Sequence, residues 1–148
     1  NPVGFPVYQC NRKTKRTRVR SVLFGGTILS YNSKTPKIDK RKQAQGIAPN
    51  FVHSMDSAHM MLTVNLANQD GISDFAMIHD DFGTHAGNIE KFRSNIREAF
   101  VKMYKDNEPL HDLYVSCALA LSDTALPPVP DYGDLDIMQV LESEYFFG

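Results

Sequence analysis

Apolar and charged side chains alternate along the first part of this chain, which is the pattern of a half-exposed β-strand. The alternation runs over about residues 16–31, and Gly25-Gly26 in its second half can adopt the two positive φ angles of a tight hairpin turn. We therefore predict a β-hairpin over about residues 16–31. The next segment, residues 32–36, has the Asn, Ser and Pro content that is typical of a turn.

Downstream of this segment, apolar residues recur at spacings of three and four, which is typical of helices. Asn50 is the predicted cap of a helix that runs to about Asn68, and Gly71 follows its end. Asn88 is the predicted cap of a second helix, whose apolar stripe continues to Met103. The remaining predictions are a helix over residues 109–122, a stiff proline-rich linker over residues 126–130, and a short last helix from its cap Asp134 to about Glu144. The fold class that follows is α+β, with helices packed on a small antiparallel sheet.

The composition is that of an ordinary globular protein. With 148 residues, of which 42% are hydrophobic, the chain is long enough to bury a core. The sequence contains no apolar run of membrane-spanning length and no signal peptide. Cys10 and Cys117 show neither metal-ligand spacing nor a disulfide pattern, which favours a reducing compartment.

The net charge of −1 conceals a strong division along the chain. Residues 1–42 carry eleven Lys or Arg and one acid, Asp39, a net charge of +10, whereas residues 43–148 carry −11. A segment this basic is either a solvated tail or a surface that contacts nucleic acid. The acidic remainder would need metal ions between its carboxylates and any phosphate group.

An acidic turn is the strongest candidate for chemistry. Residues 75–84 read Phe-Ala-Met-Ile-His-Asp-Asp-Phe-Gly-Thr, so an apolar run leads to two adjacent carboxylates, Asp80 and Asp81. A strand, a tight turn and a second strand would hold an acid at the tip, where it suits a hard cation such as Mg²⁺. Acids held on a sheet are also typical of two-metal phosphoryl transfer. The alternative is a solvated turn, since aspartate is common in turns.

A second segment, residues 46–59, reads Gly-Ile-Ala-Pro-Asn-Phe-Val-His-Ser-Met-Asp-Ser-Ala-His. Together the two segments resemble the single-subunit, phage-type DNA-directed RNA polymerases, a family that includes the mitochondrial RNA polymerases. The pair His79-Asp80 is also similar to the equivalent element of A-family DNA polymerases, which is the weaker alternative. The resemblance covers the whole chain and implies the palm part of a right-hand polymerase, at the carboxy-terminal end of a much longer chain. Without the rest of such a polymerase, this chain is not expected to polymerise.

The resemblance implies a role for individual residues of these segments. Asp80 would bind catalytic Mg²⁺ in a two-metal site that an aspartate outside this chain completes. Asp81 would be an auxiliary ligand or a solvated turn residue, and His79 would orient the hairpin. His53 would contact the growing end of the RNA–DNA hybrid through the minor groove. The alternative for His53 is a hydrogen-bonded helix histidine without a role in catalysis.

The resemblance also implies a role for the basic hairpin. In the family, a protruding hairpin that follows a Pro-X-Gly-Phe-Pro stretch, here residues 2–6, enters the major groove of the promoter. Arg18 and Arg20 alternate onto one face of its first strand, where an arginine fork can bind guanine. On the return strand, Ile28 and Ser30 alternate onto one face in the same way. The residues expected to hold phosphates are Arg12, Lys13, Lys15 and Arg16. The alternative is a charged edge strand that prevents aggregation.

The end of the chain resembles the aromatic tail of the same family, which folds back towards the active centre. Leu141-Glu142-Ser143 precedes this tail, and Phe147 and Gly148 are expected to form its functional carboxy terminus. The predicted parts of the chain are residues 1–45 with the hairpin, residues 46–125 with the palm and its acidic turn, and residues 126–148 with the linker and tail.

These features predict part of a DNA-directed RNA polymerase, which adds ribonucleoside triphosphates to an RNA 3′-hydroxyl on a DNA template. The expected partners are template and promoter DNA, the RNA transcript, ribonucleoside triphosphates and the remaining amino-terminal part of the polymerase, with no membrane. The expected location is the cytoplasm of an infected bacterial host cell, in preference to mitochondria. Two other functions remain open: a subunit of a split polymerase, and a DNA-binding subunit without catalysis.

Overall fold

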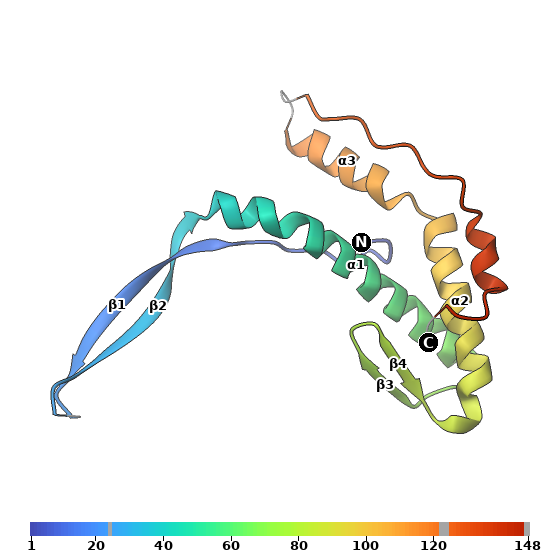
Figure 1. Cartoon of the computed structure of the whole chain (residues 1–148), viewed down its shortest axis with the longest axis horizontal. Helices are drawn as coiled ribbons and strands as arrows, with labels where there is room; N and C mark the ends of the chain where they lie inside the picture. The colour runs from blue at the N-terminus through green and yellow to red at the C-terminus, as the bar shows by residue number, and fades with distance from the viewer. Residues whose placement is uncertain (24, 122–124, 147–148) are drawn as a thin grey trace. The chain divides into compact units, whose positions relative to one another are not determined.

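The computed structural model describes residues 1–23, 25–121 and 125–146, and it combines helices with two small antiparallel sheets (Figure 1). The α+β class is confirmed, whereas two sheets of two strands each replace the single predicted sheet. Among the described residues, none of the helices has the length and apolar composition needed to cross a bilayer. The elements in chain order are β1 (Arg12–Ser21), β2 (Thr27–Ile38), α1 (Lys40–Gln69), β3 (Phe75–Ile78), β4 (Asp81–Thr84), η1 (Ala86–Asn88), α2 (Ile89–Lys105), α3 (Pro109–Ala120) and η2 (Ile137–Leu141).

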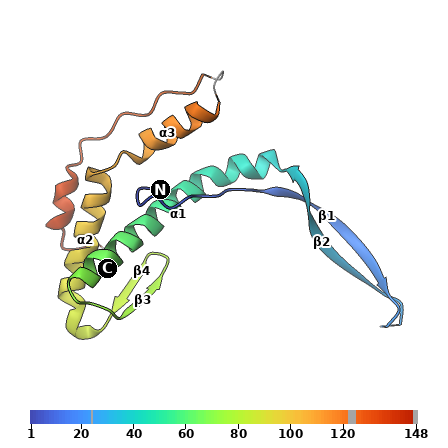
Figure 2. The same cartoon turned by 180° about the vertical axis from the view of Figure 1, so that it is seen from behind.

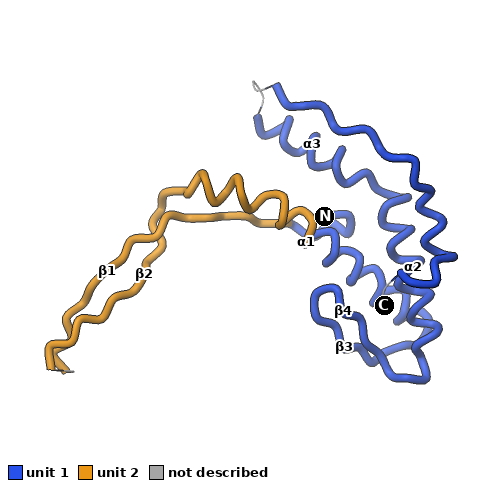
Figure 3. Tube along the Cα trace, in the orientation of Figure 1, with its two compact units in different colours: residues 1–6, 54–148 blue, residues 7–53 orange. Residues whose placement is uncertain are grey.

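The chain forms two compact units, which Figure 3 shows in blue and orange. Unit 1 comprises Asn1–Pro6 and Ser54–Gly148, and unit 2 comprises Val7–His53. The boundary falls inside α1, so this helix contributes its first part to unit 2 and its second part to unit 1. The division into three parts that the sequence suggested stays a prediction.

In unit 2, β1 and β2 pair as an antiparallel ribbon that is longer than the predicted hairpin. The register continues as far as the pair formed by Arg12 and Ile38. The predicted turn over residues 32–36 is therefore wrong, because these residues belong to β2. A register shift between Arg12 and Thr14 lies beside Pro36, which cannot donate to the ladder, and a bulge at this point lets the strand continue.

The turn of the ribbon is also longer than predicted. Ser21 pairs with Thr27, so the two strands end too far apart in the sequence for a two-residue turn. Gly25 and Gly26 do adopt positive φ angles, 61° and 84°, as their sequence predicted. The N–H of Gly26 donates to the carbonyl of Ser21 at 3.0 Å.

Helix α1 begins earlier than predicted because Asp39, and not Asn50, caps it. The Oδ1 atom of Asp39 accepts a hydrogen bond from the backbone N–H of Lys42 at 3.2 Å. The helix continues through Pro49, which removes one hydrogen bond from the helix ladder. Asn50 uses its side chain differently, since its Nδ2 donates to Oε1 of Gln9 at 3.0 Å.

Helix α1 ends at a glycine, as predicted. Gly71 has a φ of 83°, and its N–H donates to the carbonyl of Asn68 at 3.0 Å. The N–H of Ile72 donates to the carbonyl of Ala67 at 2.9 Å. This pair of bonds is a Schellman motif, and the contact between its two apolar residues joins the helix end to the core.

The core of unit 1 lies where the end of α1, the β3–β4 hairpin and α2 meet (Figure 2). The predicted apolar stripe of α2 faces this core, since Phe92 and Ile96 are buried in it. Asn88 precedes α2 as predicted, but its side chain makes no capping hydrogen bond. The residues of the core cluster are Ala67, Ile72, Phe92 and Ile96, and those packed against it are Phe75, Met77, Phe82 and Phe146.

The last part of unit 1 returns along α2. Helix α3 begins at Pro109 as predicted but ends at Ala120, since Leu121 is no longer helical. Residues 126–130 are extended, as their prolines predicted.

Asp134 does not cap the last helix, which is a 3₁₀ turn that begins later. Asp136 is the cap, because its Oδ1 accepts from the N–H of Met138 at 3.0 Å.

Candidate functional site

The acidic turn lies at the tip of the β3–β4 hairpin. His79 and Asp80 form a two-residue turn between Ile78 and Asp81, which face each other across the ladder. His79 has a φ of 58°, the single positive value among the described residues other than glycine. Positive φ at the first turn position suits the twist of the flanking strands, and histidine tolerates it better than most side chains. The turn thus brings together three exposed side chains: His79, Asp80 and Asp81.

One face of the hairpin packs on the core. On the other face, small residues let the two strands approach each other closely. Met77 and Phe82 pair across the ladder and both pack against the core cluster. On the other face Ala76 pairs with Gly83. A Cβ atom added to Gly83 would lie only 2.9 Å from the carbonyl oxygen of Ala76. Gly83 is therefore needed for the spacing of the strands that carry the acidic turn.

A buried histidine of α1 lies under this hairpin. His59 is 4% exposed, and its Nε2 lies 2.8 Å from the carbonyl oxygen of Ile96 on α2. Because a carbonyl oxygen only accepts, Nε2 donates this hydrogen bond. The ring centroid of His59 lies 5.3 Å from that of Phe82 and 5.4 Å from that of Phe100. Burial lowers the pKa of His59, so its ring is neutral at pH 7.

The sequence pattern predicted a functional role for His53 but none for His59 on the same helix. His59 lies on the buried stripe of α1, together with Met55 and Thr63, whereas His53 is exposed. Membership of that stripe is the sequence signal that distinguishes a structural histidine from a surface one. His53 belongs to unit 2, and the acidic turn belongs to unit 1.

The donor set at the turn suits part of a metal site. Asp80 offers carboxylate oxygens, the ligands that Mg²⁺ prefers, from an exposed position on a short hairpin. Nowhere in the described part of the chain do three His, Cys, Asp or Glu side chains gather closely enough to hold a metal ion. Asp81 is the exposed neighbour of Asp80, on the first residue of β4.

The β1–β2 ribbon presents arginines along one face. The register places Arg18 opposite Ser30 and Arg20 opposite Ile28, so these four residues share a face, as predicted. Arg16 belongs to the same face, and its Nη2 donates to Oγ of Ser30 at 2.9 Å. The name arginine face is used here for Arg16, Arg18 and Arg20 on β1, which lie beside short or apolar partners on β2.

The opposite face of the ribbon combines lysines with apolar side chains. Lys13 and Lys15 lie on this face, because successive strand residues point to opposite sides. They are accordingly separated from Arg16, with which the prediction grouped them. The large apolar residues of this face are exposed: Val19, Leu29 and Tyr31. Exposed apolar side chains that gather on one face are typical of surfaces that bind a partner.

The end of the described chain packs on α2. Arg97 is 7% exposed, and its Nε and Nη2 donate to the carbonyl oxygen of Ser143 at 3.2 and 2.8 Å. The ring of Phe146 lies 4.8 Å from that of Phe100, so the tail contacts the same aromatic residue as His59. The predicted terminal residues that lie outside the described part of the chain are Phe147 and Gly148.

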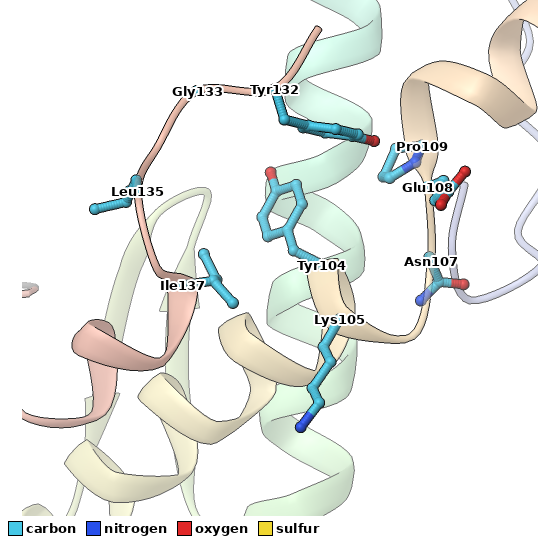
Figure 4. Close-up of a pocket in the computed structure, with 9 residues that line it drawn as sticks. All are labelled: Tyr104, Lys105, Asn107, Glu108, Pro109, Tyr132, Gly133, Leu135 and Ile137. Carbon is cyan, nitrogen blue, oxygen red and sulfur yellow. The ribbon is translucent and has the colours of Figure 1, made fainter.

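A cavity of about 420 Å³ lies between the end of α2, the start of α3 and the extended chain before η2 (Figure 4). Tyr104 and Tyr132 point into it from two sides, with Pro109 beside them. Burial raises the pKa of Tyr104, which keeps its phenol neutral. None of the predicted site residues lines this cavity, so it is separate from the acidic turn.

The sequence matches known proteins along its full length. The family described as DNA-dependent RNA polymerase matches residues 1–124. The chain is 44% identical to a DNA-directed RNA polymerase of Enterobacteria phage K11 and 40% identical to the mitochondrial DNA-directed RNA polymerase 1 of Arabidopsis thaliana, over 99% of the chain in each case. It spans 17% and 14% of the length of these two relatives. It is also 39% identical to DNA-directed RNA polymerase 1A of Nicotiana tabacum, of which it spans 91%.

Proposed function

The chain belongs to the DNA-dependent RNA polymerase family, and we propose that it supplies one catalytic aspartate and the promoter-reading hairpin of such an enzyme. The reaction is the template-directed attack of an RNA 3′-hydroxyl on a ribonucleoside triphosphate, with release of pyrophosphate. The observation that supports the proposal most directly is the position of Asp80 at the tip of a short hairpin, inside the segment that the family matches.

Asp80 is the proposed magnesium ligand. When bound, Mg²⁺ supplies Lewis-acid chemistry, lowering the pKa of the 3′-hydroxyl and neutralising charge on the phosphates. The second aspartate of the ligand set is proposed to come from outside this chain. Asp81 is an auxiliary ligand in this proposal. The strained backbone of His79 fixes the direction in which the turn presents Asp80.

His53 is proposed to contact the growing end of the RNA–DNA hybrid. Its exposure on α1 leaves the imidazole accessible to nucleic acid. A contact in the minor groove depends little on base identity, because A·T and T·A pairs present the same acceptors there. Such a contact can test the geometry of a base pair without favouring any one sequence.

The arginine face of the ribbon is proposed to bind promoter DNA. Arg18 and Arg20 are spaced by two residues on one strand, so both forks can reach base edges in one major groove. Arg16 is held by Ser30 at the base of this face, which suits a phosphate contact that fixes orientation. Lys15, on the opposite face, is a second phosphate contact in this proposal.

The proposed partners are template and promoter DNA, the transcript, ribonucleoside triphosphates and the remaining amino-terminal part of the polymerase. Relatives from phages and from plant mitochondria share similar identity with this chain. The proposed location is the cytoplasm of a bacterial host cell, with the mitochondrion as the alternative.

One further function has structural support. The basic ribbon belongs to a unit of its own, separate from the acidic turn, so it could bind DNA without catalysis. A DNA-binding subunit would bind promoter DNA whether or not Asp80 is present. A subunit of a split polymerase would need a second chain for every step of synthesis.

The test is magnesium-dependent RNA synthesis by this chain, alone and combined with the remaining part of the polymerase, on a promoter template. We expect synthesis in the combination and none with the chain alone. Asp80→Asn in the combination should abolish incorporation and leave promoter binding intact. The matched control is Asp74→Asn, which removes an exposed carboxylate just before β3 in the same unit, outside the turn, and should retain most activity.

Each result separates the functions. Incorporation at the normal rate by the Asp80→Asn variant would exclude a metal-binding role for Asp80. Promoter binding without synthesis in any combination would favour the DNA-binding subunit. Synthesis by the chain alone would mean that both metal ligands lie within it.

A further inference from the structure

The hairpin that carries Asp80 is too small to fix its own position. Each of its strands has four residues, and a two-stranded hairpin of this size is marginally stable in water. The direction in which Asp80 points must therefore be set by the residues on which the hairpin rests. Among the hairpin residues that pack against the core, Phe82 is the nearest to the tip, two residues beyond Asp80 on β4.

Phe82 contacts the rings of His59 and Phe92. Its centroid lies 5.3 Å from that of His59, with an angle of 53° between the planes, and 6.5 Å from that of Phe92. Phe92 is an apolar core residue, and a hydrophobic contact alone does not define an orientation. His59 differs because its ring is also hydrogen-bonded.

The surroundings of His59 fix its ring plane. Its Nε2 donates to the carbonyl oxygen of Ile96, which anchors the ring to the middle of α2. Its edge-to-face contact with Phe100, at 81° between planes, limits rotation from the other side. A buried imidazole without a partner would be unfavourable, so the hydrogen bond selects a single ring orientation. His59 thus joins α1, α2 and β4 at one point.

We propose that His59 is a positioning residue of nucleotidyl transfer, which holds Phe82 and through it the strand that presents Asp80. This inference rests on the proposed catalytic role of Asp80. It gives a buried side chain a role that neither the acidic turn nor the exposed His53 can perform, since neither joins the three elements. His59 itself touches no substrate.

The test uses two variants of the complete polymerase. His59→Leu removes both the hydrogen bond and the aromatic contact, whereas His59→Gln keeps an amide nitrogen near the position of Nε2. We expect kcat of His59→Leu to fall roughly tenfold to a hundredfold, the range for a catalytic group displaced by up to about 1 Å. The Mg²⁺ concentration for half-maximal rate should rise severalfold, while KM for ribonucleoside triphosphates stays within about twofold of the wild-type value, because the nucleotide site is not touched. His59→Gln should recover most of the loss.

A matched control separates positioning from general loss of stability. Met103→Ala removes a side chain of α2 that is 1% exposed and is not part of the cluster under the hairpin. It should lower the melting temperature at least as much as His59→Leu does, without changing the Mg²⁺ dependence. If His59→Leu keeps the wild-type Mg²⁺ dependence, or if Met103→Ala shifts it equally, the positioning role is refuted.

Asp80→Asn is measured in parallel. An inactive Asp80→Asn variant beside a His59→Leu variant with normal Mg²⁺ dependence would overturn the positioning role and leave the catalytic role of Asp80 in place. An active Asp80→Asn variant would overturn the catalytic role, and the inference about His59 with it.

Discussion

Replacing Gly83 by alanine should show how closely the geometry of the acidic turn depends on the spacing of two strands. The new Cβ would lie 2.9 Å from the carbonyl oxygen of Ala76. Carbon and oxygen atoms of neighbouring strands normally approach to about 3.3–3.6 Å, so the strands must separate by about 0.5 Å. The obstructing atom belongs to the backbone, so no side-chain rotation can relieve the contact.

The size of the effect follows from this displacement. Overpacking of this kind typically costs about 1–3 kcal/mol. For a chain of this length each kcal/mol lowers the melting temperature by about 2–4 °C, so we expect a decrease of about 2–12 °C. The clash lies two residue pairs from the turn, so Asp80 should move by a similar distance. Since a misplacement of about 1 Å can reduce a rate a hundredfold, half of that should reduce incorporation by roughly tenfold.

Melting followed by circular dichroism, and single-nucleotide incorporation by the complete polymerase, measure the two effects. Gly133→Ala is the matched control, because its Cβ would meet no atom within 4 Å. Adding Ala76→Gly to Gly83→Ala should not restore activity, since the carbonyl oxygen remains in place. A Gly83→Ala variant that melts and incorporates like the Gly133→Ala control would show that the strand spacing does not position Asp80.

Three further predictions concern binding, pH and the tail. Arg20→Ala should reduce the preference for promoter over other DNA by about 1–3 kcal/mol. Lys15→Ala should leave this preference unchanged and reduce the slope of log binding constant against log salt concentration by about 1. Equal effects of the two variants in a salt titration would mean that both residues contact phosphates. Burial lowers the pKa of His59, so below about pH 6.5 this side chain takes up a proton in the unfolded chain but not in the folded one. The stability of the fold should therefore decrease from pH 7.5 to pH 5.5. His59→Gln should reduce this pH dependence in melting measured at each pH, and an identical pH profile would contradict the burial of a neutral ring. Arg97→Lys should lower the free energy of unfolding by about 1–3 kcal/mol in chemical denaturation, because one ammonium group cannot reproduce both hydrogen bonds to Ser143. A decrease below about 0.5 kcal/mol would mean that Arg97 does not hold the tail.

The acidic turn could be located from the sequence because the information for it is local. An apolar run before the acids and an aromatic residue after them indicate two short strands, and the polar residues between them leave room only for a tight turn. In the ribbon, the alternation of side chains placed Arg18 and Arg20 on one face. It failed at the turn of the ribbon, because Val22 and Leu23 continue the strand pattern in sequence but are 89% and 93% exposed in the loop.

The start of α1 was missed because only part of the information for it is local. Gly46 and Pro49 are both typical of helix ends, yet α1 passes through them. The segment before β1 lies alongside, where Nε2 of Gln9 donates to the carbonyl of Gln43 at 2.7 Å. A Cβ on Gly46 would lie 3.2 Å from that same Nε2, so the glycine permits this approach. Asp39 is a local cap, but Gln9, which contacts this part of the helix, lies more than thirty positions away, and no local pattern contains that contact.

The role of His59 was missed for a related reason. Its partner Ile96 lies 37 residues away on another helix, and Phe82 lies on a strand between them in sequence. A histidine on an apolar helix face is a recognisable feature, but its hydrogen-bond acceptor is a backbone carbonyl, which every residue carries. The sequence can therefore indicate that such a histidine is buried without indicating what it holds.

The ribbon has a consequence for the behaviour of this protein in concentrated solution. As a two-stranded sheet, it leaves one open edge on each strand within the described residues, and such edges can add strands from other molecules. Two copies that met edge to edge would bring rows of Lys and Arg to about 4.8 Å, the spacing of neighbouring strands. Their repulsion is screened over about 10 Å at 0.1 M salt but only about 3 Å at 1 M. Concentrated solutions should therefore stay clear at low salt and form β-rich aggregates as the salt concentration rises.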